Sequence, residues 1–463
     1  MKKTIIILIL CFSAIILNSC GTPPVSIFTM QRMIAINADG SPHRYPTKIG
    51  NNVIAAHDYN YSNHVAEIIK SIRKSGRTNI LIFVFGGMNT LDATIKKSDV
   101  FVRDISDTSD YYPIMVNWES SLFDAYFEHL MWNRRGRKDI YFGPALSPFY
   151  LLADLGRAIT RLPINLVYQS IGIADDYDFD IKNHSDTITS INKMNIRISH
   201  GTDYTPAYKK VLRGVIYSFG FPIRIITTPL IDAGGKSAWD IMLRRTRLAL
   251  QKQRDDVVLK DGTVKISFVP PNGSLSILMD ALSDLYKEDN KYFFTLIGHS
   301  LGPVMLNELI RQYPDLPYRN IVYMGASCTI RDAGYALNPY MSNHTNTTFY
   351  NLCLHSNADK YDMMWFAVLP RGSILEWIDT FLGDPLTSDD LTLGKWNNSL
   401  RVLYSISPEF RKHIVIKSFG INDPQTNIIL IDEPQQHTDF SDPKLRFWEP
   451  SFWQVKPLTQ NKK

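Results

Sequence analysis

The chain has 463 residues, of which 44% are hydrophobic and 21% are charged. This composition is that of a folded globular protein and excludes a largely disordered chain. The 50 basic and 45 acidic residues give a net charge of +5, and no run of Lys or Arg is interleaved with aromatic residues. Nucleic acid is therefore not an expected partner.

The N-terminal residues are predicted to be a targeting segment. Two lysines precede an apolar run at 5–17, which is short for a membrane span. The run ends in Leu-Asn-Ser-Cys at 17–20, which resembles the lipobox of bacterial lipoproteins. This resemblance implies removal of a signal peptide, residues 1–19, and lipid attachment to Cys20. An ordinary secretory signal is the alternative.

We expect residues 20–30 to form a tether, so that the protein is held to the bacterial cell envelope by its lipid anchor. Gly21 after the Cys favours the outer membrane, on its periplasmic or surface side. The folded domain is then expected over residues 31–463.

Runs that are apolar at nearly every position predict strands buried on both faces. They lie at 79–87, 111–118, 292–298, 320–327, 347–355 and 413–420. An edge strand or hairpin arm is expected at 32–40. Residues 64–76 have the periodicity of an amphipathic helix that stops at a glycine. Strands alternating with helices predict an α/β fold with a mostly parallel central sheet and helices on both faces.

Two insertions are expected in this domain. The first, at about 119–290, precedes the strand at 292–298 and contains a predicted amphipathic helix pair at 147–172. That pair is explained by ordinary packing against the sheet, by a cap over a site, or by a membrane-facing surface. The second insertion, at about 361–411, is expected to be a loop-helix-loop excursion between the last two strands.

The sequence Gly-His-Ser-Leu-Gly at 298–302 lies between the strand at 292–298 and a run with helical periodicity. Glycines two residues before and after Ser300 allow a tight turn and close packing of the following helix. A serine exposed at such a turn can act as a nucleophile if a base lies beside it. We therefore expect Ser300 to sit on a nucleophile elbow, whereas a glycine-rich turn without chemistry is the alternative.

With this motif the chain resembles the α/β-hydrolase superfamily of serine esterases and lipases, over about 79–118 and 291–440. The resemblance implies an α/β-hydrolase fold and the order nucleophile, acid, histidine. Asp359, just beyond the strand at 347–355, is the expected acid, and Asp423 is its alternative.

His437, in a polar loop after the last strand, is the expected base. The alternatives are His355, which lies in or at the end of a predicted strand, and His413, which begins one; a histidine in a loop past the last strand is better placed to act as the base. His299 is expected to be part of the turn and not the base.

The same resemblance implies an oxyanion hole made of two backbone N–H groups. One is expected from Leu301, directly after the nucleophile. The other is expected from Gly87 or Met88, in a loop where the family often has His-Gly-Gly. Phe85 replaces the histidine here, so only the backbone role of that loop is expected to remain.

These residues predict a serine hydrolase that cleaves a carboxylic ester, on a small molecule or a lipid, through an acyl-enzyme. An acyltransferase with the same triad and a non-catalytic, lipid-anchored binding protein are the alternatives. No cofactor is expected, and no Cys/His or Asp/Glu cluster has metal-binding spacing. Cys328 and Cys353 are interpreted as core thiols, with a disulfide between them as the alternative.

Overall fold

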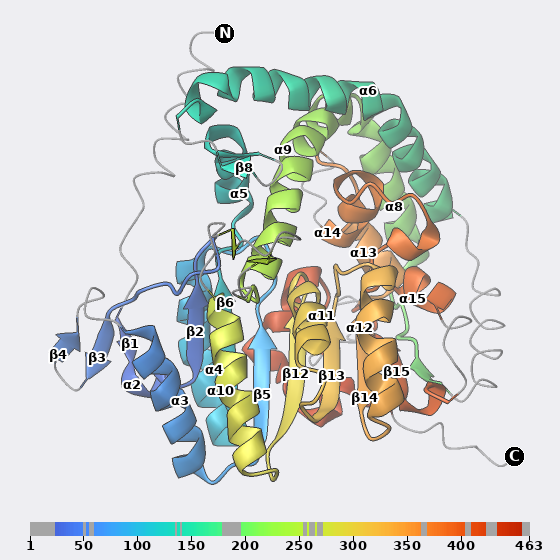
Figure 1. The fold of residues 1–463 in the computed structure, drawn as a ribbon. Helices are drawn as coiled ribbons and strands as arrows, with labels where there is room; N and C mark the ends of the chain where they lie inside the picture. The colour runs from blue at the N-terminus through green and yellow to red at the C-terminus, as the bar shows by residue number, and fades with distance from the viewer. Residues whose placement is uncertain are drawn as a thin grey trace, which may run out of the picture.

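The fold is seen in a computed structural model of the chain (Figure 1). It describes residues 24–49, 52–54, 60–134, 137–138, 141–177, 196–252, 257–258, 264–265, 272–362, 368–402, 409–422 and 433–455. Cys20 and Asp423, two of the predicted site residues, lie outside these ranges, as does the predicted signal peptide.

The centre of the molecule is an eight-stranded sheet in which all neighbouring strands pair in parallel. In their order across the sheet the strands are β2 (Met33–Ile36), β6 (Tyr111–Trp118), β5 (Asn79–Val84), β12 (Phe293–His299), β13 (Tyr318–Met324), β14 (Thr348–Cys353), β15 (Ile414–Ser418) and β9 (Arg197–Ser199). The prediction of an α/β fold with a mostly parallel sheet is therefore confirmed.

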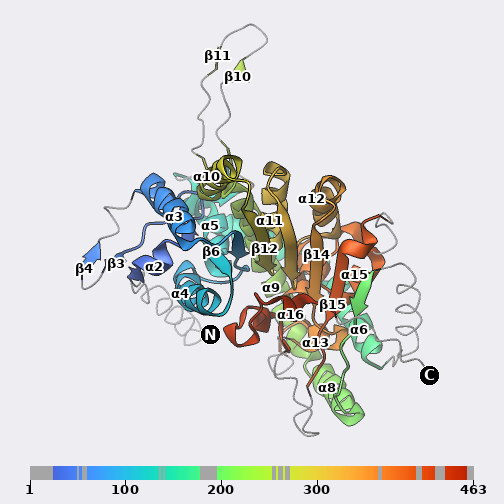
Figure 2. The ribbon, with the colours of Figure 1, turned by 90° about the horizontal axis from the view of Figure 1, so that it is seen from below.

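The strands are apolar throughout because both faces of the sheet are covered. On β5, Ile80 and Ile82 belong to one hydrophobic core, whereas Leu81 and Phe83 belong to the core on the other face. Figure 2 shows helices on both sides of the sheet. The helices on one side are α3 (Tyr61–Ser75), α10 (Ser274–Glu288), α11 (Gly302–Gln312) and α12 (Ile330–Asn343), and those on the other are α4 (Leu91–Thr108) and α16 (Pro450–Trp453).

All six predicted buried strands and the edge strand near the N-terminus are present, with their ends shifted by a few residues. The helix expected at 64–76 is α3, which ends with Gly76 in the left-handed conformation at φ +68°. Strand β9 was not predicted. It has only three residues and one buried side chain, Ile198, so its sequence carries no apolar run.

The first insertion contributes to the main domain through β9, in its middle, which forms an edge strand of the sheet, and through α10, at its end, which packs beside α3. Its other helices form a cap at the carboxyl ends of the strands (Figure 1). The helices of this cap are α5 (Leu122–Met131), α6 (Gly143–Tyr177), α8 (Ala207–Phe219) and α9 (Phe221–Leu248). The insertion also contains the short hairpins β7–β8 (Asn133–Arg134 and Arg137–Lys138) and β10–β11 (Val257–Val258 and Val264–Lys265).

The expected helix pair at 147–172 is a single 35-residue helix, α6, that continues through Pro148 and Pro163. In Figure 1 it runs across the top of the molecule and turns down at its far end. A proline inside a helix removes one hydrogen bond and bends the helix without always ending it. The segment therefore forms one helix, whereas a pair of helices was predicted.

The second insertion is a set of short helices that meets the cap, since η2 lies against both α6 and α9. Its elements are α13 (Ser356–Tyr361), α14 (Ile374–Trp377), the π-helix η2 (Ile378–Leu382), η3 (Ser388–Asp390), α15 (Trp396–Val402) and η5 (Arg411–His413). The C-terminal part adds η7 (His437–Ser441) and η8 (Pro443–Leu445).

The N-terminal part is packed from Val25 onwards, unlike the tether expected at 20–30. Val25 is buried, and the hydroxyl of the fully buried Thr29 donates a hydrogen bond to Asp99 at 2.5 Å. The elements here are β1 (Val25–Ser26), α2 (Ile27–Met30), β3 (Thr47–Ile49) and β4 (Asn52–Ile54).

Candidate active site

Ser300 occupies a sharp turn between β12, which ends at His299, and α11, which begins at Gly302. Its φ is +54°, a left-handed conformation that non-glycine residues rarely adopt. Two backbone hydrogen bonds to β13 and the loop after it fix the turn. The Ser300 N–H donates to the Met324 carbonyl at 2.9 Å, and the Ser327 N–H donates to the Ser300 carbonyl at 2.8 Å. Ser300 therefore has the strained strand-to-helix position expected of a nucleophile elbow.

The glycines around Ser300 are required by close approach of other atoms. A Cβ on Gly302 would lie 2.4 Å from the Val84 carbonyl oxygen, and one on Gly298 would lie 2.8 Å from the Pro303 nitrogen. A Cβ on Gly86, in the loop after β5, would lie 2.8 Å from the Cβ of Ser300 itself. Any side chain at these positions would move α11 or the serine.

His437 lies against this turn, at the start of η7. A Cβ on Gly325, the residue after Met324, would be 2.9 Å from Cε1 and 3.0 Å from Nδ1 of the His437 ring. The His299 and His437 rings are 5.2 Å apart between centroids, and the His299 Nε2 donates to the His437 carbonyl oxygen at 3.0 Å. The structure thus brings His437 to the elbow, and His299 supports it from within the turn.

The His437 imidazole is buried, and neither ring nitrogen forms a hydrogen bond with a described residue. Burial, together with the neighbouring His299, lowers the pKa of His437 well below its ordinary value. The ring is therefore neutral at physiological pH, which is the form a general base needs. The Ser300 hydroxyl is not hydrogen-bonded to the ring here, and such contacts often tighten only when a substrate is bound.

The two alternative histidines are placed differently. His413 precedes β15 at its amino end, whereas Ser300 follows β12 at its carboxyl end, so in a parallel sheet the two lie at opposite edges. The His355 Nδ1 accepts a hydrogen bond from the Asn357 N–H and caps α13. His437 is the candidate base of the three.

The predicted acid, Asp359, lies on α13 just after β14 and is 3% exposed. Neither carboxyl oxygen forms a hydrogen bond of good geometry with a described residue. Burial raises the pKa of Asp359 to about 7, while Lys395 and the nearby Ser373 hydroxyl act in the opposite direction. An unsatisfied buried carboxylate of this kind can accept a proton donor such as an imidazole N–H.

A second carboxylate, which was not predicted, touches the histidine loop directly. Asp362 follows α13, and its Oδ2 accepts a hydrogen bond from the His437 backbone N–H at 2.8 Å. Asp362 therefore holds the backbone of His437, whereas neither oxygen of Asp359 is hydrogen-bonded to a described residue. The three-residue spacing of the two aspartates in one helical turn was the sequence signal that could have indicated this pair.

The predicted oxyanion donors are also brought together. A Cβ on Gly87 would lie 3.3 Å from the Leu301 Cβ, and neither the Gly87 N–H nor the Leu301 N–H forms a backbone hydrogen bond with another described residue. Met88 differs from the expectation, because its N–H donates to the Ser120 carbonyl at 2.8 Å. Because the Met88 N–H is already hydrogen-bonded, Gly87 rather than Met88 is the available donor.

The loop that carries Gly87 is fixed by its neighbours. The Trp118 indole N–H donates to the Phe85 carbonyl at 2.8 Å, and the Phe85 ring stacks on Phe101 within the core. The cap covers the loop from outside, since the sulfur of Met242, on α9, would lie 3.8 Å from a Cβ on Gly87. The role of α9 over this site was missed, because nothing in its sequence relates it to the loop.

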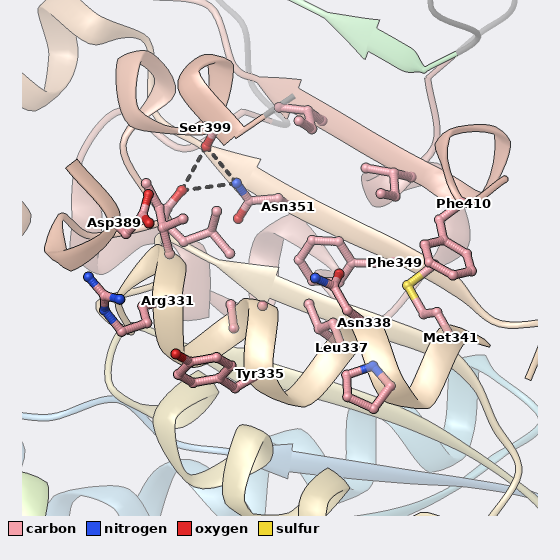
Figure 3. Close-up of a pocket in the computed structure, with 17 residues that line it drawn as sticks. Arg331, Tyr335, Leu337, Asn338, Met341, Phe349, Asn351, Asp389, Ser399 and Phe410 are labelled. Carbon is pink, nitrogen blue, oxygen red and sulfur yellow. Dashed lines mark hydrogen bonds between the residues drawn. The ribbon is translucent and has the colours of Figure 1, made fainter. Parts of the chain in front are cut away.

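A cavity of about 370 Å³ lies elsewhere, between α12 and the strands β14 and β15 (Figure 3). Its polar side chains include Asn351, whose amide donates to the Ser399 hydroxyl at 2.7 Å. None of the predicted catalytic residues lines this cavity. Of the four cysteines of the chain, Cys328 and Cys353 lie within the described residues, and both are buried free thiols.

Comparisons with protein-family models, with curated proteins and with solved structures give no match to this chain. Within the described ranges, no group of three or more His, Cys, Asp or Glu side chains is arranged to hold a metal ion. The interpretation of the site therefore depends on the residues and contacts described above.

Proposed function

We propose that the chain is a serine hydrolase of the α/β-hydrolase type that cleaves a carboxylic ester on a small molecule or a lipid. The observation that carries the proposal is the left-handed Ser300, at a turn between strand and helix, with the neutral His437 packed against the same turn. A serine exposed at a turn, an adjacent neutral imidazole and two N–H groups without a backbone partner are the groups that acyl transfer requires.

In the proposed reaction the Ser300 Oγ attacks the ester carbonyl carbon while its proton passes to His437. The carbonyl oxygen becomes an oxyanion, which accepts hydrogen bonds from the N–H groups of Leu301 and Gly87. The tetrahedral intermediate collapses, the bond to the alcohol breaks, and His437 returns the proton to the leaving alkoxide. Water then attacks the acyl-enzyme by the same route and releases the acid.

Asp359 is the proposed partner of the protonated imidazole. Its carboxylate lacks a donor in the resting site, and the imidazolium N–H formed during the reaction would supply one. Asp362 already accepts the backbone N–H of His437, so its role is to place the ring. The protein is further proposed to act in the cell envelope, attached through a lipid on Cys20.

The test is labelling of the purified full chain with a fluorophosphonate probe, followed by intact mass. Wild type should gain one adduct, Ser300→Ala should gain none, and His437→Ala should react far more slowly. Ser327→Ala is the matched control, because Ser327 is a neighbouring buried serine outside the proposed reaction, and it should label like wild type. If folded wild type takes no label, the site is a binding scaffold and the hydrolase proposal is wrong.

A further inference from the structure

The cap has an unusual distribution of charge, which is clearest in α6. Between residues 148 and 168 its charged residues are Asp154, Arg157 and Arg161, and all three face the protein. Both arginines lie within 4 Å of the fully buried carboxylate of Asp232 on α9. Asp154 pairs with His129 at 3.0 Å. The polar face of this helix is therefore its inner face.

The outer face of α6 carries no charge over the same stretch. Its six most exposed large side chains are between 56% and 69% exposed, and they are Phe149, Leu152, Ile159, Ile164, Val167 and Tyr168. A surface helix of a globular protein normally has the reverse arrangement, with charged residues outside and apolar residues inside. The inversion implies that the outer face of α6 does not normally face water.

Helix α8 repeats the inversion. Its exposed side chains form an apolar stripe at helical spacing, made of Tyr208, Val211, Leu212, Val215, Ile216 and Phe219. Of its three charged residues, Lys209 is half-buried, and Lys210 and Arg213 contact residues outside the stripe. Lys210 pairs with Asp203 at 2.7 Å, and the Arg213 guanidinium lies 4.8 Å from the centre of the Tyr361 ring.

The first turns of α9 continue the same surface. Ile223, Ile226 and Leu230 are exposed at helical spacing, whereas Arg224 is fully buried with its guanidinium 3.5 Å from the centre of the Tyr217 ring. Helices α6, α8 and α9 pack on one another, so their outer faces adjoin (Figure 1). We call the exposed side chains of residues 148–168, 208–219 and 223–230 the apolar face. A continuous uncharged surface over three helices marks an interaction site.

We propose that the apolar face inserts into one leaflet of a lipid bilayer, independently of the lipid anchor and of any catalytic activity. Lipid fits this face better than a second copy of the chain does. The face follows the outer side of the arched α6, and fluid acyl chains conform to such a shape, whereas a second copy would need a matching hollow (Figure 1).

The composition of the face also suits shallow insertion from one side. Tyr141 and Phe142, at the start of α6, are 90% and 70% exposed, and aromatic side chains of this kind are enriched at the border between lipid and water. No single helix of the described residues is long and apolar enough to cross a membrane. The pair α8 and α9, bent by 73°, does meet the criteria of length and composition together. Insertion driven by buried apolar area does not need anionic lipid.

The test uses the full chain reconstituted into phosphatidylcholine vesicles, with an environment-sensitive fluorophore on one added cysteine. Labels at Phe219→Cys, Ile226→Cys and Leu152→Cys report on the apolar face. A label at Tyr335→Cys is the control, because Tyr335 is 65% exposed on α12, away from the cap. The native Cys328 and Cys353 are buried and should not compete for the dye, whereas Cys11 and Cys20 are replaced by serine in every labelled variant.

We expect the three face labels to shift to the blue in vesicles and to be quenched by brominated acyl chains, with little change at high salt. The label at position 335 should keep the spectrum it has in water. Face labels that remain water-like and unquenched in vesicles would overturn the proposal. If the emission of the face labels shifts to the blue without lipid, and the shift grows with protein concentration, a second copy of the chain covers the apolar face instead. Fluorophosphonate labelling reports on Ser300 separately, so each proposal can fail alone.

Discussion

The Nε2 of His299 lies 3.0 Å from the carbonyl oxygen of His437 and donates a hydrogen bond to it. A carbonyl oxygen can only accept, so Nε2 carries the proton of the His299 ring. Full burial lowers the pKa of His299 to about 4, so the ring is neutral at physiological pH. The residue before the candidate nucleophile therefore positions the candidate base.

This contact predicts that His299 is a positioning residue. His299→Ala removes the donor and leaves a buried carbonyl unpaired, which we expect to displace His437 and to slow fluorophosphonate labelling about ten- to a hundredfold. His299→Gln places an amide N–H close to the position of Nε2, so it should restore most of the rate. Equal rates for the Ala and Gln variants, at equal thermal stability, would argue against a positioning role.

The burial of His437 predicts how the labelling rate depends on pH below neutrality. Because the pKa of His437 is lowered, its imidazole stays neutral below pH 6.5. In Asp359→Asn, which lacks the carboxyl group that titrates at about 7, the residual labelling rate should therefore begin to fall only at pH values well below 6.5. Rates should be measured between pH 4.5 and 8 on protein whose folding at each pH is checked by circular dichroism. A rate that halves at the pH of an unperturbed histidine would contradict the buried environment described here.

Asp359 predicts a trade between stability and activity. Its pKa is raised to about 7 in the folded chain from 3.8, so the folded state binds more protons than the unfolded state between these values. The ionised carboxylate therefore costs stability that grows as the pH rises from 3.8 to 7 and is complete above pH 7. Asp359→Asn should raise the melting temperature at pH 8, with a smaller gain at pH 5.

The same variant should lose activity, because an amide cannot stabilise the imidazolium as a carboxylate does. Asp362→Asn is the matched control: its amide oxygen can still accept the His437 N–H, so labelling should change little. The reverse result, with Asp362→Asn inactive and Asp359→Asn active, would make Asp362 the acid.

The sheet was largely predictable because its strands are buried on both faces, and such strands are apolar at nearly every residue. The same rule could not find β9, whose sequence Arg-Ile-Ser buries one side chain at the edge of the sheet. It also could not foresee the course of α6, since a proline such as Pro163 ends some helices and bends others. Whether Pro163 ends α6 or only bends it depends on the contacts that α6 makes with α9.

The candidate site was predictable where its residues are tied to strand ends. Ser300 and Gly87 follow β12 and β5, and parallel neighbours bring such positions together. The roles of Met88 and Asp362 were not predictable. They depend on the direction of the Met88 N–H and on the position of the His437 loop next to the Asp362 carboxylate. Those relations join residues such as Met88 and Ser120 that no local pattern connects.

The close approach of Gly302 to Val84 predicts how a side chain at position 302 would change both the stability of the protein and the reactivity of Ser300. Gly302→Ala places a methyl group 2.4 Å from the Val84 carbonyl oxygen, so α11 must move away from β5. We expect a loss of about 1–3 kcal/mol in the free energy of unfolding, as for other overpacked sites, and slower labelling of Ser300. Gly156→Ala is the control, because Gly156 lies inside α6 with no atom within 4 Å of a Cβ there. Gly156→Ala should gain about 0.5–1 kcal/mol in stability from helix propensity. If Gly302→Ala is as stable as wild type, the turn is less tightly packed than described.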